Sequence, residues 1–277
     1  MRKKIYLYGD GWGAIASYKG LSKNPIFDIT VVTNDEELKA MATSSADIAL
    51  SDLSDAVILF DGYKPFVPKS VLEKNVCINI HPSLLPRYRG MHSTVWAILN
   101  DEPEFGFTIH LMNEFMDDGD IIFQKAYKND YISTSTYYME EYNSYKAEHL
   151  DTILLDFLEG RITPRKQDKS QASWVGRRNL LDCKIDFNQP IAYQKAFFRS
   201  LVPPYPRPYV VYKGVALVVK KVFYHTCGVT THNGRILNID NDGLWVKLPD
   251  GYMVIQQLEY CNGNDYPLSN FRIGQRF

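Results

Sequence analysis

Residues 79–90 read NIHPSLLPRYRG and directly follow a short apolar run. Asn79 and His81 stand at alternate positions, so in a strand their side chains project from the same face. Pro82 and Pro86 force the chain out of the strand into an extended loop. A polar pair at the carboxyl end of a parallel strand stands where doubly wound domains place their sites. Asn79 could instead cap a loop, but the pair within this twelve-residue stretch favours a functional site.

Short strand-like runs alternate with helical runs on both sides of this stretch. The runs rich in Ile, Val, Tyr and Phe are nearly continuous, as in buried parallel strands. Strands are expected at 4–8, 28–33, 56–60, 77–80, 107–112 and 121–127, and helices at 13–21, 35–41, 93–99 and 134–160. This order predicts an α/β fold with a Rossmann-like, doubly wound, mostly parallel sheet.

The pattern changes from about Phe187. A helix is expected at 191–201, followed by Pro203-Pro204-Tyr205-Pro206 and by turn pairs such as Asn233-Gly234 and Asp250-Gly251. Asn-Gly and Asp-Gly between apolar runs are strong hairpin signals. The chain is therefore expected to divide into a catalytic domain, 1–186, and a small C-terminal antiparallel β subdomain, 187–277.

Composition restricts the class of protein. The 277 residues are 45% hydrophobic and 23% charged, with a net charge of -1, which is typical of a soluble globular protein and not of a nucleic-acid binder. The four cysteines form no CxxC pair. The first apolar run stops at Gly9-Asp10, too early for a signal peptide, and no run approaches the ~20 residues of a membrane span. We expect a cytoplasmic protein with no membrane or nucleic-acid partner.

The glycine-rich stretch Gly9–Ala14 fits the relaxed GxGxxA fingerprint of dinucleotide-binding domains. Asp35 ends the next strand at a distance suited to a ribose. A nicotinamide-dependent sugar-nucleotide enzyme is therefore one hypothesis. The other interpretation is a tight strand-to-helix turn, and Trp12 places a bulky side chain where a pyrophosphate would approach.

A second polar cluster is the acidic loop Met116-Asp117-Asp118-Gly119-Asp120, with His110 shortly before it. Three carboxylates in four residues cannot all be buried at neutral charge, so a solvated turn is one interpretation. His81, His92 and His110 could join these acids around a metal, but their spacing matches no standard zinc pattern. No metal is expected.

The two motifs together, NIHPSLLP at 79–86 and MDDG at 116–119, resemble those of the folate-dependent formyltransferases. This family includes glycinamide ribonucleotide, methionyl-tRNA and nucleotide-sugar N-formyltransferases. The resemblance implies Asn79, His81 and Asp117 as catalytic residues, and N10-formyltetrahydrofolate as co-substrate. The family's His-to-Asp separation selects Asp117 from the acidic loop. The resemblance also makes Gly9–Ala14 a structural turn, and it implies folate binding along Tyr63, Lys64, Phe66, Asn113, Phe115 and Met116.

The short tail and the Pro-Pro-Tyr-Pro stretch look most like the nucleotide-sugar N-formyltransferases. That likeness implies a dTDP- or GDP-linked 3- or 4-amino-dideoxysugar as acceptor, for surface polysaccharide such as the O-antigen, and a homodimer as in many relatives. The acceptor is expected to meet Trp174, Arg177, Arg178 and Tyr205, although the two arginines fit a solvated surface pair equally well. A methionyl-tRNA enzyme would carry a larger β-barrel and basic surfaces. A formyltetrahydrofolate hydrolase with the same three residues would carry a regulatory domain.

Formyl transfer needs three chemical functions. The Asn79 amide can donate to the oxyanion that forms when the amine attacks. His81 can accept the proton of the amine and return it to the leaving nitrogen near neutral pH. Asp117 would favour the imidazolium and orient the ring. No covalent enzyme intermediate is required, and Ser83 is expected to cap the loop.

Overall fold

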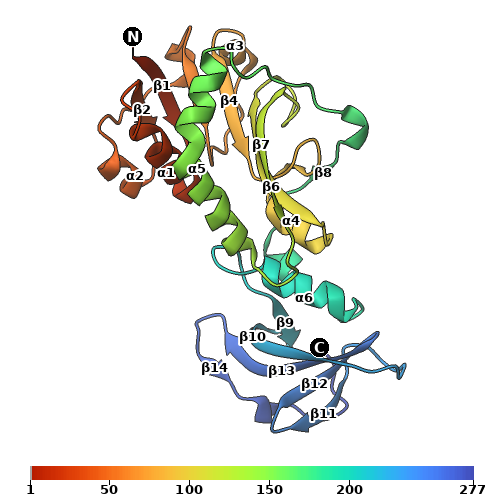
Figure 1. Cartoon of the computed structure of the whole chain (residues 1–277). Helices are drawn as coiled ribbons and strands as arrows, with labels where there is room; N and C mark the ends of the chain where they lie inside the picture. The colour runs from red at the N-terminus through yellow and green to blue at the C-terminus, as the bar shows by residue number, and fades with distance from the viewer. Residues whose placement is uncertain (1) are drawn as a thin grey trace. The chain divides into compact units, whose positions relative to one another are not determined.

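The computed structural model describes residues 2–277 and consists of two compact units (Figure 1). The first contains the residues up to Ala97, Pro103–Asn129 and Tyr137–Arg177, and the second contains Ile98–Glu102, Asp130–Thr136 and Arg178–Phe277. Two short inner segments thus pack with the C-terminal part of the chain. The division into domains at 186 and 187 stays a prediction.

The first unit is built on a six-stranded sheet in the order β2-β1-β3-β4-β6-β7. The strands are β1 (Lys3–Tyr8), β2 (Phe27–Val32), β3 (Val57–Phe60), β4 (Val76–His81), β6 (Glu104–Leu111) and β7 (Ile121–Lys128). The first four in this order run parallel, whereas β6 pairs antiparallel with both β4 and β7. The predicted Rossmann-like, mostly parallel sheet is confirmed, although β6 begins three residues earlier than expected.

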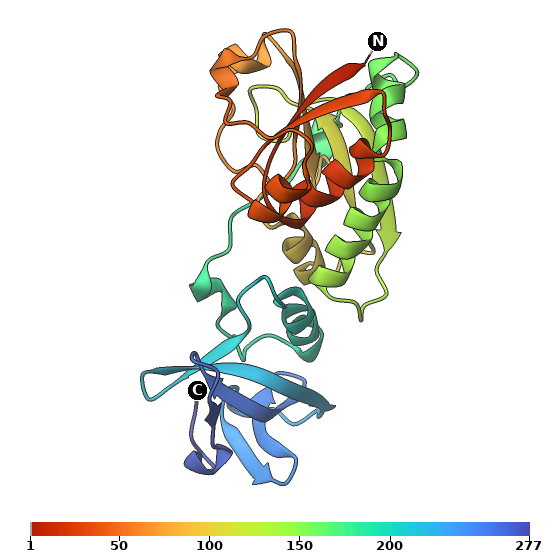
Figure 2. The same ribbon diagram turned by 90° about the vertical axis from the view of Figure 1, so that its left-hand side faces the viewer.

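Two helices, α1 (Gly11–Ser22) and α5 (Ser135–Leu158), lie side by side against the sheet (Figure 2). They approach closely at Gly20, where a Cβ would lie 2.3 Å from the carbonyl oxygen of Lys146. The helices α2 (Glu36–Met41), α3 (Lys69–Leu72) and α4 (Ser93–Leu99) complete this unit's α structure together with 3-10 turns such as η1 (Leu50–Asp52). Asp35 caps α2 by accepting a hydrogen bond from the Leu38 amide.

An ion pair is buried where α1, α5 and the end of β3 meet. The Lys146 ammonium lies 2.6 Å from Asp61 Oδ2, and the Ser17 hydroxyl donates to the same oxygen at 2.6 Å. All three residues are buried. A charged group that is buried away from water needs such partners, because burying an unpaired charge would greatly destabilise the folded state. Asp61 directly precedes the loop Gly62–Phe66, so this pair fixes the base of that loop.

The second unit contains an antiparallel sheet in the order β11-β12-β13-β10-β9. Its strands are β9 (Tyr209–Tyr212), β10 (Val215–Thr226), β11 (Ile236–Asp240), β12 (Gly243–Leu248), β13 (Gly251–Tyr260) and the short β14 (Asp265–Tyr266), which pairs with β13. The β9–β10 turn has positive φ at Lys213 and Gly214, +48° and +79°, as a type I′ hairpin requires. The antiparallel C-terminal sheet is confirmed, and α6 (Ile191–Ser200) precedes it.

No helix in the described chain, residues 2–277, has the length and apolar character that would let it cross a membrane.

Candidate active site

Four polar side chains meet at the carboxyl end of β4. Asn79 and His81 come from β4 itself, and Asp117 comes from the loop between β6 and β7. His110 lies on β6, where the antiparallel register sets it directly opposite Asn79. The structure thus brings together the three residues that the sequence predicts as catalytic and adds a fourth.

His81 is held by its Nε2 atom. That nitrogen lies 2.9 Å from the Tyr88 carbonyl oxygen and 3.1 Å from the Ser93 hydroxyl, and the ring is only 4% exposed. A carbonyl oxygen only accepts hydrogen bonds, so we assign the proton of the neutral ring to Nε2. The lone pair is then on Nδ1, which faces Asp117 Oδ2 at 3.6 Å.

Opposing effects set the protonation of this pair. Burial lowers the pKa of His81, while the nearby Asp117 carboxylate and the Tyr88 carbonyl act to raise it. Burial alone would raise the pKa of Asp117, but His81, His110 and the Gly90 amide stabilise its charged form and lower the pKa to about 2. At neutral pH the arrangement is an ionised carboxylate beside a neutral imidazole that can take up a proton at Nδ1.

Asn79 is oriented by His110. The Nδ1 atom of His110 donates to the Leu111 carbonyl at 2.7 Å, which leaves Nε2 as an acceptor for the Asn79 amide at 3.2 Å. The amide nitrogen of Asn79 also makes a long contact of 3.4 Å with Asp117 Oδ1. An oxyanion would therefore have to replace this long hydrogen bond to Asp117 in order to accept from the second N–H of Asn79. The sequence analysis considers His110 only as a possible metal ligand, and the register that sets it opposite Asn79 identifies this orienting role.

The acidic loop separates its three carboxylates. Asp117 has a left-handed backbone, φ +51°, and its Oδ2 accepts a hydrogen bond from the Gly90 amide at 2.8 Å. Asp118 turns away to Arg89 at 2.7 Å, and Asp120 lies near Lys166 at 3.6 Å. Of the three acids, Asp117 is thus the one that faces His81.

The residues predicted for folate lie on two loops beside this cluster. The loop after β3 carries Tyr63, Lys64 and Phe66, and the β6–β7 loop carries Asn113, Phe115 and Met116. An ion pair of 3.0 Å between Lys69 and Glu114 connects the two regions. The side chains of Phe66, Phe115 and Met116 are largely exposed, at 78%, 61% and 64%, which leaves apolar surface available to a planar ligand.

A groove of about 310 Å³ adjoins the acidic loop. Its walls include Phe115, Met116 and Trp174, and the Trp174 ring lies 5.6 Å from the Arg89 guanidinium. Trp174 belongs to the short strand β8 (Trp174–Val175), which pairs with β5 (Arg89–Gly90). Trp174, which is predicted to contact the acceptor, therefore shares a groove with Phe115 and Met116, which are predicted to contact the folate.

The other residues predicted for the acceptor are more dispersed. Arg177 is exposed at the end of the first unit. In the second unit, Arg178 is buried, donates to the Asp182 carbonyl and lies over the Phe197 ring at 5.7 Å, and Tyr205 is half-buried. Their contact with substrate stays a prediction.

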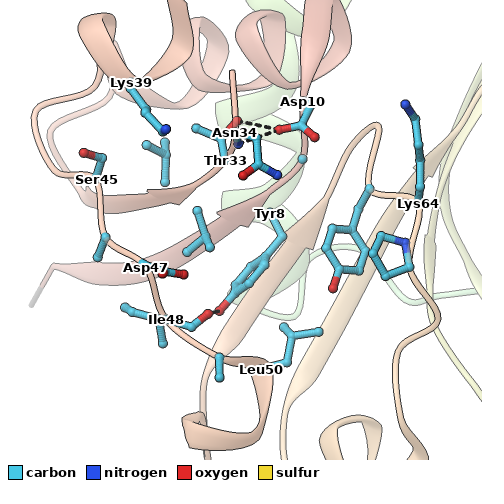
Figure 3. Close-up of a pocket in the computed structure, with 17 residues that line it drawn as sticks. Tyr8, Asp10, Thr33, Asn34, Lys39, Ser45, Asp47, Ile48, Leu50 and Lys64 are labelled. Carbon is cyan, nitrogen blue, oxygen red and sulfur yellow. Dashed lines mark hydrogen bonds between the residues drawn. The ribbon is translucent and has the colours of Figure 1, made fainter. Parts of the chain in front are cut away.

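A cavity of about 680 Å³ lies at the carboxyl ends of β1 and β2 (Figure 3). Lys39, Ser45, Asp47 and Lys64 lie around it, and the Tyr8 hydroxyl donates to the Ile48 carbonyl. It occupies the region where dinucleotide enzymes hold a ribose.

The glycine-rich turn beside this cavity is already occupied by its own side chains. The Gly11 amide donates to Asp35 Oδ2 at 2.9 Å, and Asp10 accepts from the Thr33 hydroxyl and the Asn34 amide, both at 2.8 Å. Two carboxylates therefore stand at the start of α1, where a pyrophosphate would need free amides. This geometry opposes the nicotinamide hypothesis. Residues 2–277 also contain no cluster of three or more His, Cys, Asp or Glu side chains able to hold a metal ion.

Comparison with known proteins identifies the class. A family model described as "Formyl transferase" matches residues 16–153, and one described as "Formyl transferase, C-terminal domain" matches residues 180–276. The chain belongs to the formyl transferase family, and it is an N-formyltransferase.

Among its relatives is a methionyl-tRNA formyltransferase of Ehrlichia canis, 31% identical over 90% of this chain and 82% of the relative. Among solved structures, WlaRD, a sugar 3N-formyl transferase in the presence of dTDP and 5-N-formyl-THF, aligns with a TM-score of 0.70 at 18% identity, over 95% of this chain and 99% of that one. An N-formyltransferase from Helicobacter canadensis, in complex with folinic acid and dTDP-3-aminofucose, aligns with a TM-score of 0.67 at 18% identity, over 96% and 100%. At such identity these structures establish the shared fold.

Proposed function

We propose that this enzyme transfers the formyl group of N10-formyltetrahydrofolate to the amine of a nucleotide-linked amino-dideoxysugar, with a dTDP-linked 3- or 4-amino sugar as the acceptor. The observation that carries the acceptor is the groove of about 310 Å³ beside the acidic loop, where the exposed Trp174 ring can stack on a base. Two structures that share the fold, WlaRD and the Helicobacter canadensis enzyme, are described with dTDP or a dTDP-sugar, which supports this choice of nucleotide. Surface polysaccharide synthesis is the process that such a product would serve.

The proposed chemistry is direct acyl transfer. The neutral amine attacks the formyl carbon, a C–N bond forms, and the bond from that carbon to N10 of the folate breaks. The amine's proton passes to Nδ1 of His81 and then to the departing N10. The Asn79 amide donates to the oxyanion, and Asp117, 3.6 Å from Nδ1, stabilises the imidazolium between the two proton transfers.

We place the folate across the two loops that carry apolar exposed side chains, with Tyr63, Lys64, Phe66, Asn113, Phe115 and Met116 as its contacts. We place the acceptor on Trp174, Arg177, Arg178 and Tyr205. The groove shared by Trp174, Phe115 and Met116 supports this arrangement, because co-substrate and acceptor must meet at the formyl carbon. An exposed indole ring can stack on a pyrimidine, and an arginine can hold a phosphate.

The deciding experiment compares acceptors at one concentration of N10-formyltetrahydrofolate. We expect kcat/KM for a dTDP-amino-dideoxysugar to exceed that for the free amino sugar by at least ~10², because binding energy from the nucleotide positions the amine. A GDP-linked sugar, methionyl-tRNA and a reaction without acceptor complete the set. Equal efficiency with free and nucleotide-linked amines would exclude the sugar-nucleotide acceptor.

Methionyl-tRNA is the second candidate acceptor. The 31% identity to the Ehrlichia canis methionyl-tRNA formyltransferase favours it. Faster formylation of methionyl-tRNA than of any sugar nucleotide would select it, and equal folate turnover without an amine would indicate a hydrolase.

A further inference from the structure

The segment Arg165–Val175 crosses both loops that form the active site. At its start, Arg165 exchanges two backbone hydrogen bonds with Ile121, at the end of the acidic loop. Further on, the Ser173 carbonyl accepts from the Arg89 amide at 2.9 Å, within the loop that follows β4. One stretch of chain therefore joins the loop of His81 to the loop of Asp117, and the side chains it directs inward can set the distance between them.

Gln167 is the side chain of this segment that reaches the acidic loop. Its Nε2 atom donates to the carbonyl oxygens of Asp117 at 2.7 Å and Gly119 at 2.8 Å. Its Oε1 atom accepts from the Arg89 guanidinium at 2.7 Å. A guanidinium only donates hydrogen bonds, so Arg89 determines which end of the amide faces the loop. The residue is 8% exposed, and both ends of its amide are bonded.

The acidic loop needs such support. A non-glycine residue with φ +51° is uncommon, and a strained backbone of this kind persists only where its surroundings hold it. Gly119 is pressed against β6, since a Cβ there would lie 1.7 Å from the Leu111 carbonyl oxygen. The Asp117 carboxylate is fixed on one side by the Gly90 amide, and the two hydrogen bonds from Gln167 fix the peptide on the other.

We propose that Gln167, oriented by Arg89, is a positioning residue that holds the Asp117 carboxylate against His81. It acts through the peptide carbonyls of the acidic loop and makes no contact with the reacting atoms. The inference depends on the proposed function only because that function assigns catalytic roles to Asp117 and His81. The contact between these two residues, and its dependence on Gln167, can be measured without any acceptor.

The test is Gln167→Met, which keeps the length of the side chain but removes both donors. We expect kcat to fall by about 10- to 100-fold with KM for both substrates within about threefold, because the ground state is bound as before. Gln171→Met is the matched control, since Gln171 is exposed on the same segment and bonds only weakly to Ser170, at 3.4 Å. It should behave as the parent enzyme. If Gln167→Met does not fold, Gln167→Asn is the second variant. Its side chain is shorter by one methylene, so the same N–H donors lie farther from the carbonyls of Asp117 and Gly119.

The second readout is the pKa of His81, measured by NMR in the absence of substrates. The charged and titratable groups that act on His81 are Asp117, which raises its pKa, and His110 and Arg89, which lower it. Displacing Asp117 should therefore lower the pKa of His81 in Gln167→Met and leave it unchanged in Gln171→Met. An unchanged pKa, or a lower melting temperature with the parent kcat, would overturn the proposal. Failure of every acceptor would refute the proposed function and leave this titration as an independent test.

Discussion

The carboxylate of Asp117 can be neutralised without changing its shape by Asp117→Asn. Its oxygen would still accept the hydrogen bond that the Gly90 amide now makes at 2.8 Å. The charge facing Nδ1 of His81 at 3.6 Å is lost. At an effective dielectric constant of about 20, two unit charges at that separation attract by about 4.6 kcal/mol, and partial solvation of Asp117 brings the range to about 2–5 kcal/mol.

That energy stabilises the imidazolium and not the neutral ring, so its loss in Asp117→Asn should lower the pKa of His81. We expect kcat to fall by about 10²–10³, since the stabilisation is needed only when His81 carries the proton. The assay is single-turnover formyl transfer from pH 6 to 9, beside an NMR titration of His81. Asp120→Asn is the control, because Asp120 lies near Lys166 and away from His81. Equal loss in both variants, or none in Asp117→Asn, would refute the reasoning.

Four other predictions follow from the same structure. His81→Asn and Asn79→Ala should each lower kcat by at least ~10² with the melting temperature within a few degrees of the parent, and a tenfold smaller effect would remove either from the mechanism. Activity should fall on the acid side as His81 is protonated and loses its lone pair. Because burial lowers the pKa of His81, that fall should be centred below about 6.5, and a flat profile from about pH 5 to 8 would contradict it. Lys146→Met should cost about 3–5 kcal/mol in urea unfolding by leaving Asp61 buried and unpaired, with most of it restored in a double variant with Asp61→Leu. Trp174→Ala should raise KM for the nucleotide-linked acceptor about tenfold and leave KM for a free amino sugar unchanged.

The local sequence pattern predicts the sheet and the shared position of Asn79 and His81 on β4, because the alternation of residues and the prolines that follow are local signals. Asn79 and His81 stand two residues apart, so their shared position followed from strand geometry alone. The sequence offers His110 only as a possible metal ligand, since its place opposite Asn79 depends on an antiparallel register that is set over a longer stretch of chain. The role of Gln167 could not be predicted, because its two hydrogen bonds to the acidic loop reach about 50 residues back and nothing in its own neighbourhood distinguishes it.

The burial of Lys146 has a local signal in the sequence of α5. Tyr142, Lys146 and Leu150 follow one another at four-residue spacing in α5, and all three are buried. A lysine on the apolar face of an amphipathic helix requires a partner, which indicates a carboxylate in the core. The sequence does not say which carboxylate, because Asp61 lies 85 residues away. Periodicity predicts the burial, whereas the pairing depends on how the helices pack.

Two backbone carbonyls determine which ring nitrogen of each histidine in this site carries the proton. The Tyr88 carbonyl holds Nε2–H of His81 and leaves Nδ1 free beside Asp117, whereas the Leu111 carbonyl holds Nδ1–H of His110 and turns Nε2 to the Asn79 amide. Both lone pairs lie 3.6 Å from the Asp117 carboxylate, Nδ1 of His81 from Oδ2 and Nε2 of His110 from Oδ1, so the difference between the rings is what else each lone pair binds. The lone pair of His110 is already used to orient the oxyanion donor. Proton transfer and orientation thus fall to different histidines because of main-chain contacts, although the two side chains have the same intrinsic chemistry.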